Sequence, residues 1–580
     1  MIESNYYEDN EDLRFVMEHF VNWEALIPLK EKNYEDSKKY IETKDERYSL
    51  APSDLKETLD NYLDILNRIG HIAGKNVAPV ARKMEKEGLK LENGKVIFPE
   101  DFLRLFNIVK EAGILGFPMP REYGGLNMPL PCIMGLKEMF TRADNSFEIA
   151  IAVSFLSNVL YHFTSQELIE KYVPEMVQGT LSGAMGLTEP DFGSDLAHII
   201  TKAEKQSDGT YLITGTKRFI THGCGVGDTP ALLFTLARTS GSGGKGLGFF
   251  LSKSTDVQVS RIEEKLGLHC SPTCELVYEK TPAILIGKEG EGLIKYVMGM
   301  LNHGRMGVAI ESIGLAQAAY EEAKKYASER VQFGVLINTF PAIKRLLDEM
   351  DSKIQASRAI VYFISEMLEI YELQLAKMQK EGISEKEIRK NPNMAVSDKL
   401  TKLLTSVAKL ISSEYANEVA YDALQIFGGA GFTEEYDIAK IYRDARISTI
   451  YEGTSQIHII TSATVLKDGL KAEGFLEKFL MEKIHPLNDL NRQSSLRQLL
   501  TDLLELMSLY QTKEGEIKES RSKEVVFAFS HLLGLVLLAQ QIEIAEKKMP
   551  EDFVKRKITA FENYVYLTRS VFASAKVYLN

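Results

Sequence analysis

The sequence has little cysteine and almost no tryptophan: four cysteines and one tryptophan in 580 residues. So few cysteines cannot build a disulfide framework in a chain of this length, which favours a reducing compartment. Cys270 and Cys274 are close enough in sequence to suggest a metal-ligand pair, but no second pair accompanies them. A zinc site is therefore not predicted.

The sequence also lacks a targeting signal and a membrane-spanning run. Residues 1–10 are acidic and have neither a basic start nor an apolar core, so no secretory signal or transit peptide is predicted. The longest apolar run, residues 525–539, is interrupted by Ser530 and His531 and is too short to cross a bilayer. We expect a buried bundle helix there, with docking at a membrane surface as the alternative. These features predict a cytoplasmic protein without a transmembrane segment.

The overall composition is that of an ordinary globular protein, with 44% hydrophobic and 26% charged residues. The net charge of −12 argues against a general affinity for nucleic acid. A chain of 580 residues exceeds what one hydrophobic core supports, so two to four domains are expected.

The pattern of apolar residues changes along the chain and predicts a mainly α fold with a central β-domain. Helical spacing before residue 180 gives way to short alternating segments and turns, including the hairpin signal Asp208-Gly209. Helical spacing then returns in three long segments and a shorter one, which indicates a four-helix bundle. We predict an N-terminal extension (1–45), a helical domain (46–180), a β-barrel-like domain (181–288), the bundle (289–465) and a C-terminal helical extension (466–580).

One carboxylate has a sequence context that suggests acid–base chemistry. Glu452 lies in the run Ile-Tyr-Glu-Gly-Thr-Ser-Gln-Ile at residues 450–457. The neighbouring Tyr451 can desolvate the acid and raise its pKa toward neutrality, as a general base for a carbon-bound proton requires. Gly453 lets the backbone approach a ligand, and the next three residues offer two hydroxyls and an amide. The alternative interpretation is a strand–loop–helix junction with one of the hydroxyl residues as N-cap.

Four further motifs precede Glu452. Residues 185–195 (Met-Gly-Leu-Thr-Glu-Pro-Asp-Phe-Gly-Ser-Asp) form a turn that could present N–H groups to an electron-rich ring, or a purely structural turn. Residues 217–223 (Lys-Arg-Phe-Ile-Thr-His-Gly) predict a strand that ends in a hydroxyl-bearing loop. Residues 330–334 (Arg-Val-Gln-Phe-Gly) and 425–432 (Gln-Ile-Phe-Gly-Gly-Ala-Gly-Phe) close helices, where glycines are also ordinary caps.

In this order, the motifs resemble those of the acyl-CoA dehydrogenase flavoprotein family over residues 60–465. The extra N-terminal segment and C-terminal helices are similar to the longer subgroup of that family. The resemblance implies FAD held where the three domains meet. The FAD contacts that it implies are Met185, Leu187, Thr188, Ser194, Phe219, Thr221, Thr454 and Gln456, together with Arg330, Gln332, Gln425, Gly428 and Gly429 toward the FAD of a neighbouring subunit. The substrate contacts that it implies are Ser194, Arg305, Tyr451 and Gly453.

The resemblance also implies a reaction. Glu452 would remove the α-proton of an acyl-CoA thioester while the β-carbon gives a hydride to flavin N5, and the product would be a trans-2-enoyl-CoA. Electrons would leave through an electron-transfer flavoprotein, and FAD shared between subunits implies at least a homodimer. Some relatives carry the base just before the arginine that matches Arg305, but Gly304 cannot act here. Glu189, in the Thr-Glu-Pro turn, is predicted to be structural.

The sequence departs from the family pattern at three positions. Phe219 stands where the ring-covering residue is usually Trp, His222 replaces the usual Asn, and Pro341 replaces a Gln that in many relatives contacts the partner's FAD. Stacking should survive at Phe219 with less area, whereas the contact at Pro341 is in doubt.

Alternatives to this function remain open at the level of sequence. An acyl-CoA oxidase shares the base and the flavin but reduces oxygen, and a nitroalkane oxidase would have Asp at position 452. A non-catalytic relative acting as a binding or assembly protein would have a basic surface or a lost base. The acyl group is not specified: a saturated straight chain is the default, and a short sulfur-bearing chain is possible in the longer subgroup.

Overall fold

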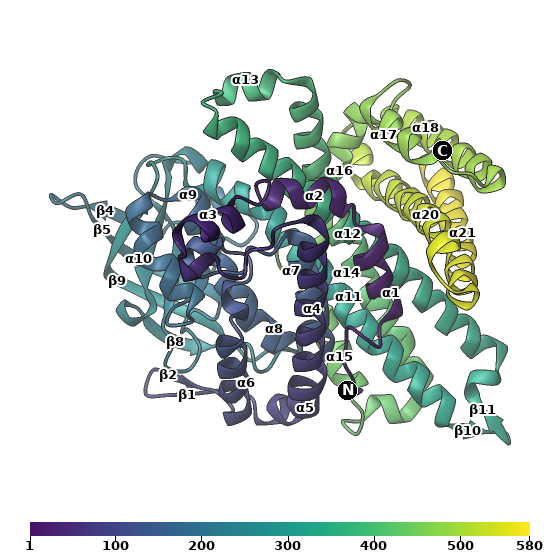
Figure 1. Cartoon of the computed structure of the whole chain (residues 1–580), viewed down its shortest axis with the longest axis horizontal. Helices are drawn as coiled ribbons and strands as arrows, with labels where there is room; N and C mark the ends of the chain where they lie inside the picture. Colours follow the sequence, from purple (N-terminus) through teal and green to yellow (C-terminus); the bar gives the residue numbers. More distant parts are fainter.

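A computed structural model describes residues 1–580. The β-sheet domain lies to one side of the long helices, at the left of Figure 1, and the N-terminal segment crosses the helices of the first domain before the chain enters it. A β-hairpin of β1 (Lys90–Glu92) and β2 (Lys95–Ile97) interrupts the N-terminal helices. These helices are α1 (Glu11–Phe15), α2 (Trp23–Lys30), α3 (Glu35–Thr43), α4 (Leu55–Ile72), α5 (Ala78–Glu87), α6 (Glu100–Glu111), α7 (Leu130–Ala143), α8 (Asn145–Ala152), α9 (Ser157–Phe163) and α10 (Gln166–Val177).

The β-domain is a closed sheet with two appended strands. Strands β6, β4, β5, β9 and β7 pair in a ring that returns to β6, while β3 adds to β6 in parallel and β8 adds to β9. The predicted hairpin joins β4 to β5, and the glycine-rich residues 241–246 connect β6 to β7. The strands are β3 (Ser182–Gly186), β4 (Lys202–Lys205), β5 (Tyr211–Thr221), β6 (Ala231–Arg238), β7 (Leu247–Lys253), β8 (Gln258–Ile262) and β9 (Thr273–Ile286).

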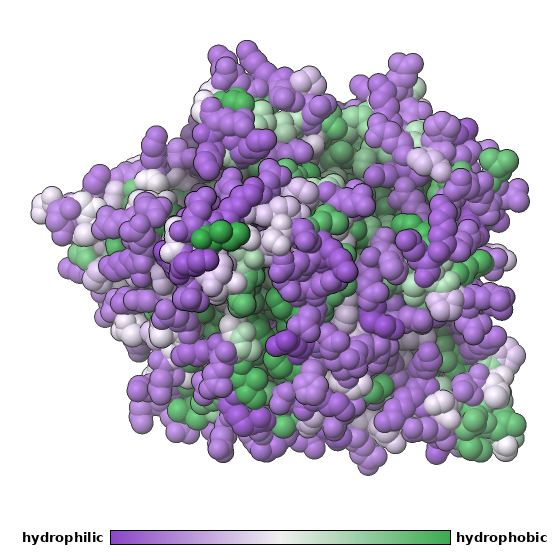
Figure 2. All heavy atoms as spheres, viewed as in Figure 1, coloured by the Kyte–Doolittle hydropathy of each residue, from purple (hydrophilic) through white to green (hydrophobic).

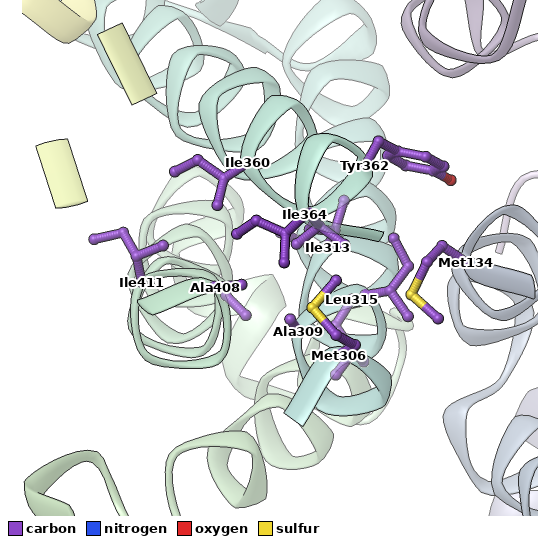
Figure 3. Packing of buried hydrophobic residues seen from close by; sticks show 14 of the residues in the cluster. Met134, Met306, Ala309, Ile313, Leu315, Ile360, Tyr362, Ile364, Ala408 and Ile411 are labelled. Atoms are coloured by element: carbon purple, nitrogen blue, oxygen red, sulfur yellow. The ribbon is translucent and has the colours of Figure 1, made fainter. Parts of the chain in front are cut away.

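The bundle is formed by three long helices and the shorter α16. Side chains of α11, α12 and α14 interdigitate around Ile313, Ile364 and Ala408, and Met134 of α7 packs on the outer side of α11 (Figure 3). Small residues on α11 permit close approach: a Cβ at Gly314 would lie 2.7 Å from the carbonyl oxygen of Glu138. The elements are α11 (Met298–Glu329), β10 (Val331–Gln332), β11 (Val335–Leu336), α12 (Pro341–Lys380), α13 (Glu385–Lys390), α14 (Pro392–Phe427), α15 (Ile438–Ala445) and α16 (Ser455–Gly469).

The C-terminal extension packs against the bundle through α20, α21 and α12. Two helical stretches, Asn145–Phe163 and Gly515–Lys548, are long and apolar enough to span a membrane by length and composition alone. The second is 89% buried within the protein, which is typical of a core helix. The prediction of a buried helix at residues 525–539 is therefore confirmed. The extension consists of α17 (Phe475–Ile484), α18 (Leu490–Gln511), α19 (Gly515–Ser520), α20 (Ser522–Lys548) and α21 (Glu551–Leu579).

A buried ionic network joins both extensions to the bundle. Arg358 of α12 donates to Asp12 of α1 at 2.6 Å and to Glu138 of α7 at 2.6 and 3.0 Å. Lys557 of α21 also pairs with Asp12 and donates to Gln541 at 2.7 Å. The four ionised side chains balance in charge, so each buried charge has a partner of opposite sign.

The predicted fold class, mainly α with a central β-barrel-like domain, is confirmed. We propose residues 45, 180, 288 and 465 as the ends of the first four segments of the chain. Their support is that β3 begins at Ser182 and that the helical run into α11 begins at Gly292, close to two of these positions.

Candidate active site

Glu452 lies in a short loop between the 3₁₀ turn Arg446–Thr449 and α16. Its backbone has φ +53°, and Gly453 follows with φ +97°. A left-handed conformation at a non-glycine residue costs about 1–2 kcal/mol, and it persists only where neighbouring contacts hold it. The strand–loop–helix alternative is wrong on the N-terminal side, because the preceding segment is helical. It is right that a helix begins at Ser455.

Two contacts hold the loop on either side of Glu452. The Tyr451 hydroxyl donates to Oε2 of Glu311 on α11. On the other side, Lys409 of α14 is fully buried and donates from Nζ to the Gly453 carbonyl at 2.6 Å. These buried partners fix the residues before and after the strained position.

His458 supplies a third contact to the same loop. Its Nε2 lies 3.2 Å from the Glu452 carbonyl oxygen, which can only accept, so Nε2 carries the proton. Burial lowers the pKa of His458 to about 3, so the ring is neutral. A Cβ at Gly453 would lie 3.0 Å from this nitrogen, which explains the need for glycine there.

The Glu452 carboxylate faces α11 at a position without a side chain. A Cβ at Gly304 would lie 2.7 Å from Oε2 of Glu452, so the two predicted base positions converge in space and glycine makes room for the glutamate. Burial raises the pKa of Glu452, and the charge of Glu311 raises it further, whereas Lys409 and Arg305 lower it. A raised pKa makes a carboxylate a better acceptor for a weakly acidic proton.

Two donors near Glu452 have no partner in the protein. Nε of Arg305 is buried and unpaired, and the backbone N–H of Glu452 makes no hydrogen bond. Groups of this kind are costly to bury unless a ligand or water satisfies them. The structure brings together Arg305, Tyr451, Gly453 and Glu452, four residues that the resemblance assigned to the site.

Among the polar residues that follow Glu452, one hydroxyl is held by a hydrogen bond within the protein and two side chains are not. Thr454 is the N-cap of α16 by position, but its side chain accepts no capping hydrogen bond. The Ser455 hydroxyl is committed to Oε1 of Glu414 at 2.5 Å. Thr454, half-buried, and Gln456, exposed, therefore keep their polar groups available for a ligand.

The first group of predicted FAD contacts gathers on β3 and β5. Nζ of Lys217 donates to the Leu187 carbonyl at 2.9 Å, and the Arg218 N–H donates to the Thr188 carbonyl at 2.9 Å, so the turn lies against β5. Met185, Leu187, Thr188 and Thr221 are half-buried, while Ser194 is exposed. The Phe219 ring is 51% exposed at a residue with φ +62°, a position open to a planar ligand.

Glu189 is structural, as predicted. Its buried carboxylate accepts from the N–H groups of Ile200 and Thr201 at 2.7 and 2.9 Å and from Lys217 at 2.9 Å. His222 packs inward beside Phe98, with ring centroids 6.1 Å apart, and burial lowers its pKa to about 3. The His222 ring therefore anchors the loop after Phe219.

The second group of predicted FAD contacts lies at the far end of the bundle. Arg305 and Arg330 are near opposite ends of α11, roughly 37 Å apart along a helix that rises about 1.5 Å per residue. Tyr326 stacks on Phe427 at 4.2 Å, which brings the ends of α11 and α14 together. This end carries exposed Arg330, Gln332, Gln425, Gly428 and Gly429, and a Cβ at either glycine would meet nothing within 4 Å. Pro341 begins α12 and has no side-chain donor to offer.

Sequence reasoning missed the charged residues that surround the base. Lys409, Glu311, Lys137 and Glu148 are all buried, and none belongs to a recognisable motif. The available signal was a single charged residue inside an otherwise apolar helical run, as at Val308-Ala309-Ile310-Glu311-Ser312-Ile313. A charge in such a run is rarely buried without a partner.

Comparisons with known proteins find relatives that cover most of the chain. Residues 61–180, 184–281, and 290–385 with 388–467 match the N-terminal, middle and C-terminal domains of acyl-CoA dehydrogenase. The short-chain specific acyl-CoA dehydrogenase of Megasphaera elsdenii is 32% identical over 70% of this chain and 97% of its own. The chain belongs to the acyl-CoA dehydrogenase family.

Two further relatives match more of the chain. The 3-methylmercaptopropionyl-CoA dehydrogenase of Ruegeria pomeroyi is 29% identical over 79% of this chain and 76% of its own. The acyl-CoA dehydrogenase of Bacillus anthracis, solved in complex with FAD, superposes with a TM-score of 0.74 and 25% identity over 90% of this chain and 87% of its own. As a member of this family, the chain is an oxidoreductase with FAD as its cofactor.

The residues of this acyl-CoA dehydrogenase fit that cofactor. The exposed Phe219 ring, the free hydroxyl of Thr454 and the half-buried turn at Leu187 and Thr188 offer an apolar face and polar contacts for a flavin. The open backbone at Gly428 suits the close approach of a diphosphate.

Proposed function

We propose that this enzyme dehydrogenates an acyl-CoA thioester to a trans-2-enoyl-CoA, with Glu452 as the base that removes the α-proton. The observation that carries this proposal is the Glu452 carboxylate, held over Gly304 in a left-handed loop with its pKa raised by burial. Bound FAD supplies the acceptor for the hydride that leaves the β-carbon.

The chain's own groups account for the proton transfer. A carboxylate with a raised pKa takes a weakly acidic α-proton more readily, and the charges of Lys409 and Arg305 favour its ionised form. The unpaired backbone N–H of Glu452 is placed in our proposal beside the thioester oxygen, where it stabilises the developing enolate.

The two separated groups of FAD contacts support a dimer. One FAD molecule cannot reach both ends of α11, so we propose that Arg330, Gln332, Gln425, Gly428 and Gly429 bind the FAD of the partner subunit. Exposed apolar side chains surround this end, with Phe333 93% and Phe432 87% exposed. Hydrophobic residues gather in Figure 2 at the lower right, where Figure 1 labels β10 and β11.

The decisive experiment is anaerobic reduction of the bound flavin by substrate. Glu452→Gln should bind FAD with the spectrum of the wild type, but addition of acyl-CoA should no longer bleach the flavin absorbance. Glu418→Gln, a half-exposed carboxylate on α14 that pairs with Lys353, is the matched control and should bleach normally. Normal bleaching in Glu452→Gln would refute the assignment of the base.

The acyl group and the electron acceptor follow from two further assays. A screen of acyl-CoAs from short to long chains, including 3-methylmercaptopropionyl-CoA, identifies the substrate with an artificial acceptor. We propose an electron-transfer flavoprotein as the natural acceptor and the cytoplasm as the location, as the family resemblance and the sequence suggest. Peroxide formation when the reduced enzyme meets air would instead indicate an oxidase.

A further inference from the structure

A buried cluster of ionisable side chains lies directly behind the base. Nζ of Lys137 on α7 lies 3.1 Å from Oε1 of Glu311 on α11 and also pairs with Oε1 of Glu148 on α8. Oε2 of the same Glu311 accepts the hydroxyl of Tyr451, the residue next to Glu452. The three ionisable side chains are nine-tenths or more buried, and burial raises the pKa of Glu148 to about 8. Glu311 therefore links the cluster to the loop that carries Glu452.

The cluster packs against α11 on the same face as the base. A Cβ at Gly307 would lie 3.5 Å from Cε of Lys137 and 3.8 Å from Oε1 of Glu311, which is ordinary van der Waals contact. At Gly304, one turn earlier on this face, a Cβ would collide, because it would lie 2.7 Å from Oε2 of Glu452. The base and the lysine that faces Glu311 therefore lie against adjacent turns of α11.

Stability alone does not account for these residues. Buried ion pairs contribute little compared with apolar residues of the same volume, because desolvation offsets their attraction. Oε2 of Glu148 has no hydrogen-bond partner, so the cluster is not fully satisfied even internally. The group with a direct link to function is Glu311, through Tyr451.

We propose that Glu311 is a positioning residue for the base: it holds Tyr451 by a hydrogen bond, and its charge, offset by Lys137, sets how readily Glu452 accepts a proton. This inference rests on the proposed role of Glu452. It assigns to the cluster an effect on the reaction rather than on the fold.

The sign of each effect follows from charge. A nearby negative charge disfavours the ionised form of a carboxylate, so Glu311 raises the pKa of Glu452. Lys137 lies against Glu311 and offsets part of that charge. The ionisable groups that face or adjoin the Glu452 loop are Arg305 and Glu311 from α11, Lys409 and Glu414 from α14 and His458 from α16, with Lys137 from α7 and Glu148 from α8 behind them.

The test is the pH dependence of kcat for two variants with opposite expectations. The acid limb of this profile is the range in which kcat rises with pH as Glu452 loses its proton. Glu311→Gln keeps an acceptor for Tyr451 but removes the charge, so the acid limb should move to lower pH by about one unit. Lys137→Met keeps the length of the side chain but leaves the charge of Glu311 uncompensated, so the acid limb should move to higher pH. Lys353→Met, a buried lysine of α12 paired with Glu418, is the matched control and should leave the limb unchanged.

A third variant separates position from charge. Tyr451→Phe removes the hydrogen bond but leaves the Glu311 side chain in place, so kcat should fall about tenfold while the acid limb does not move. If Lys137→Met does not fold, Glu311→Gln still tests the charge of Glu311 and Tyr451→Phe its position. Each variant is first shown to bind FAD, and its unfolding temperature is compared with that of the wild type.

Two results would overturn the inference. One is an unshifted acid limb in a FAD-replete Glu311→Gln, and the other is a shift in the same direction for the Glu311 and Lys137 variants. Failure of the proposed function looks different, because the wild-type flavin would then not be reduced by any acyl-CoA.

Discussion

At the scale of single residues, the base is defined as much by a missing side chain as by a present one. The Glu452 carboxylate occupies the space that a side chain at position 304 would fill. A methyl group there must displace either the carboxylate or the loop, whose backbone is already strained at φ +53°. Gly304 therefore belongs to the catalytic geometry although it has no functional group.

This relation gives a direct prediction. Gly304→Ala should lower kcat about tenfold or more while FAD binding is retained, because a small displacement of a catalytic base costs at least that much. The measurement is steady-state kinetics together with the flavin absorbance of the purified variant. Gly299→Ala near the start of the same helix faces the ring of Phe163 at 3.2 Å and is the control. Unchanged kcat in Gly304→Ala would contradict the described position of Glu452.

Lys409 acts on the base with the sign opposite to that of Glu311. Its positive charge favours the ionised carboxylate, so Lys409→Met should move the acid limb of the kcat profile to higher pH. The lost hydrogen bond to Gly453 should also lower kcat about tenfold. Burial lowers the pKa of Lys409 to about 8, so in the wild type its contribution should fade above that pH. A pH profile identical to that of the wild type would be inconsistent with this role.

At the scale of elements, the sequence predicted the long helices and the hairpins well and the charged interior poorly. The strand after Asp208-Gly209 and the helix at residues 525–539 follow from local turn chemistry and apolar runs, which one segment specifies by itself. The ion pair of Lys137 with Glu311 and the hydrogen bond of Lys409 to the Gly453 carbonyl join elements that are far apart in sequence. No local pattern encodes such partners, so they appear only when the helices are packed.

For the loop that carries Glu452, too, the sequence predicted the local features but not the contacts with other elements. The octapeptide around Glu452 predicted that a helix starts shortly after the acid, and α16 does begin at Ser455. The left-handed conformation of Glu452 could not be predicted, because it depends on Tyr451, Gly453 and His458 reaching partners on other elements or across the loop.

The network at Arg358 makes a prediction about how the elements hold together. Arg358→Met removes the guanidinium that pairs with both Asp12 and Glu138. Removing one partner from a buried ion pair costs about 3–5 kcal/mol of stability. The midpoint of thermal unfolding should fall by several degrees, measured by differential scanning fluorimetry at neutral pH. Lys555→Met, an exposed lysine on α21, is the control and should leave the midpoint unchanged.

Acid should weaken the same network. The positive charges of Lys557 and Arg358 hold the pKa of the Asp12 carboxyl well below its usual range. A depressed carboxyl pKa stabilises the fold above the unfolded value, near 4, and that stability is lost as pH falls below it. In Asp12→Asn, stability should therefore decline less steeply below pH 4 than in the wild type, as followed by fluorescence of the single tryptophan, Trp23. Identical acid transitions would exclude Asp12 as a contributor.

At the scale of the whole molecule, the apolar end of the bundle predicts the assembly. Phe333→Asp places a charge on the most exposed aromatic side chain near β10 and β11. If this end is the dimer contact, the variant should be monomeric by light scattering and should lose FAD, because the partner's Arg330 no longer reaches it. Leu490→Asp, on the exposed part of α18 in the C-terminal extension, is the control and should remain dimeric. A dimeric, FAD-replete Phe333 variant would refute the proposed contact.

The length of α11 has a consequence for genetics. If the two ends of this helix serve two different flavins, every catalytic centre is assembled from two copies of the polypeptide. A homodimer of subunits inactivated at Glu452 then has no activity, and neither has a homodimer of subunits inactivated at Arg330. A mixed dimer places both lesions in one centre and leaves the other intact. Co-expression of the two defective alleles should therefore restore activity by intragenic complementation, although neither allele has any alone.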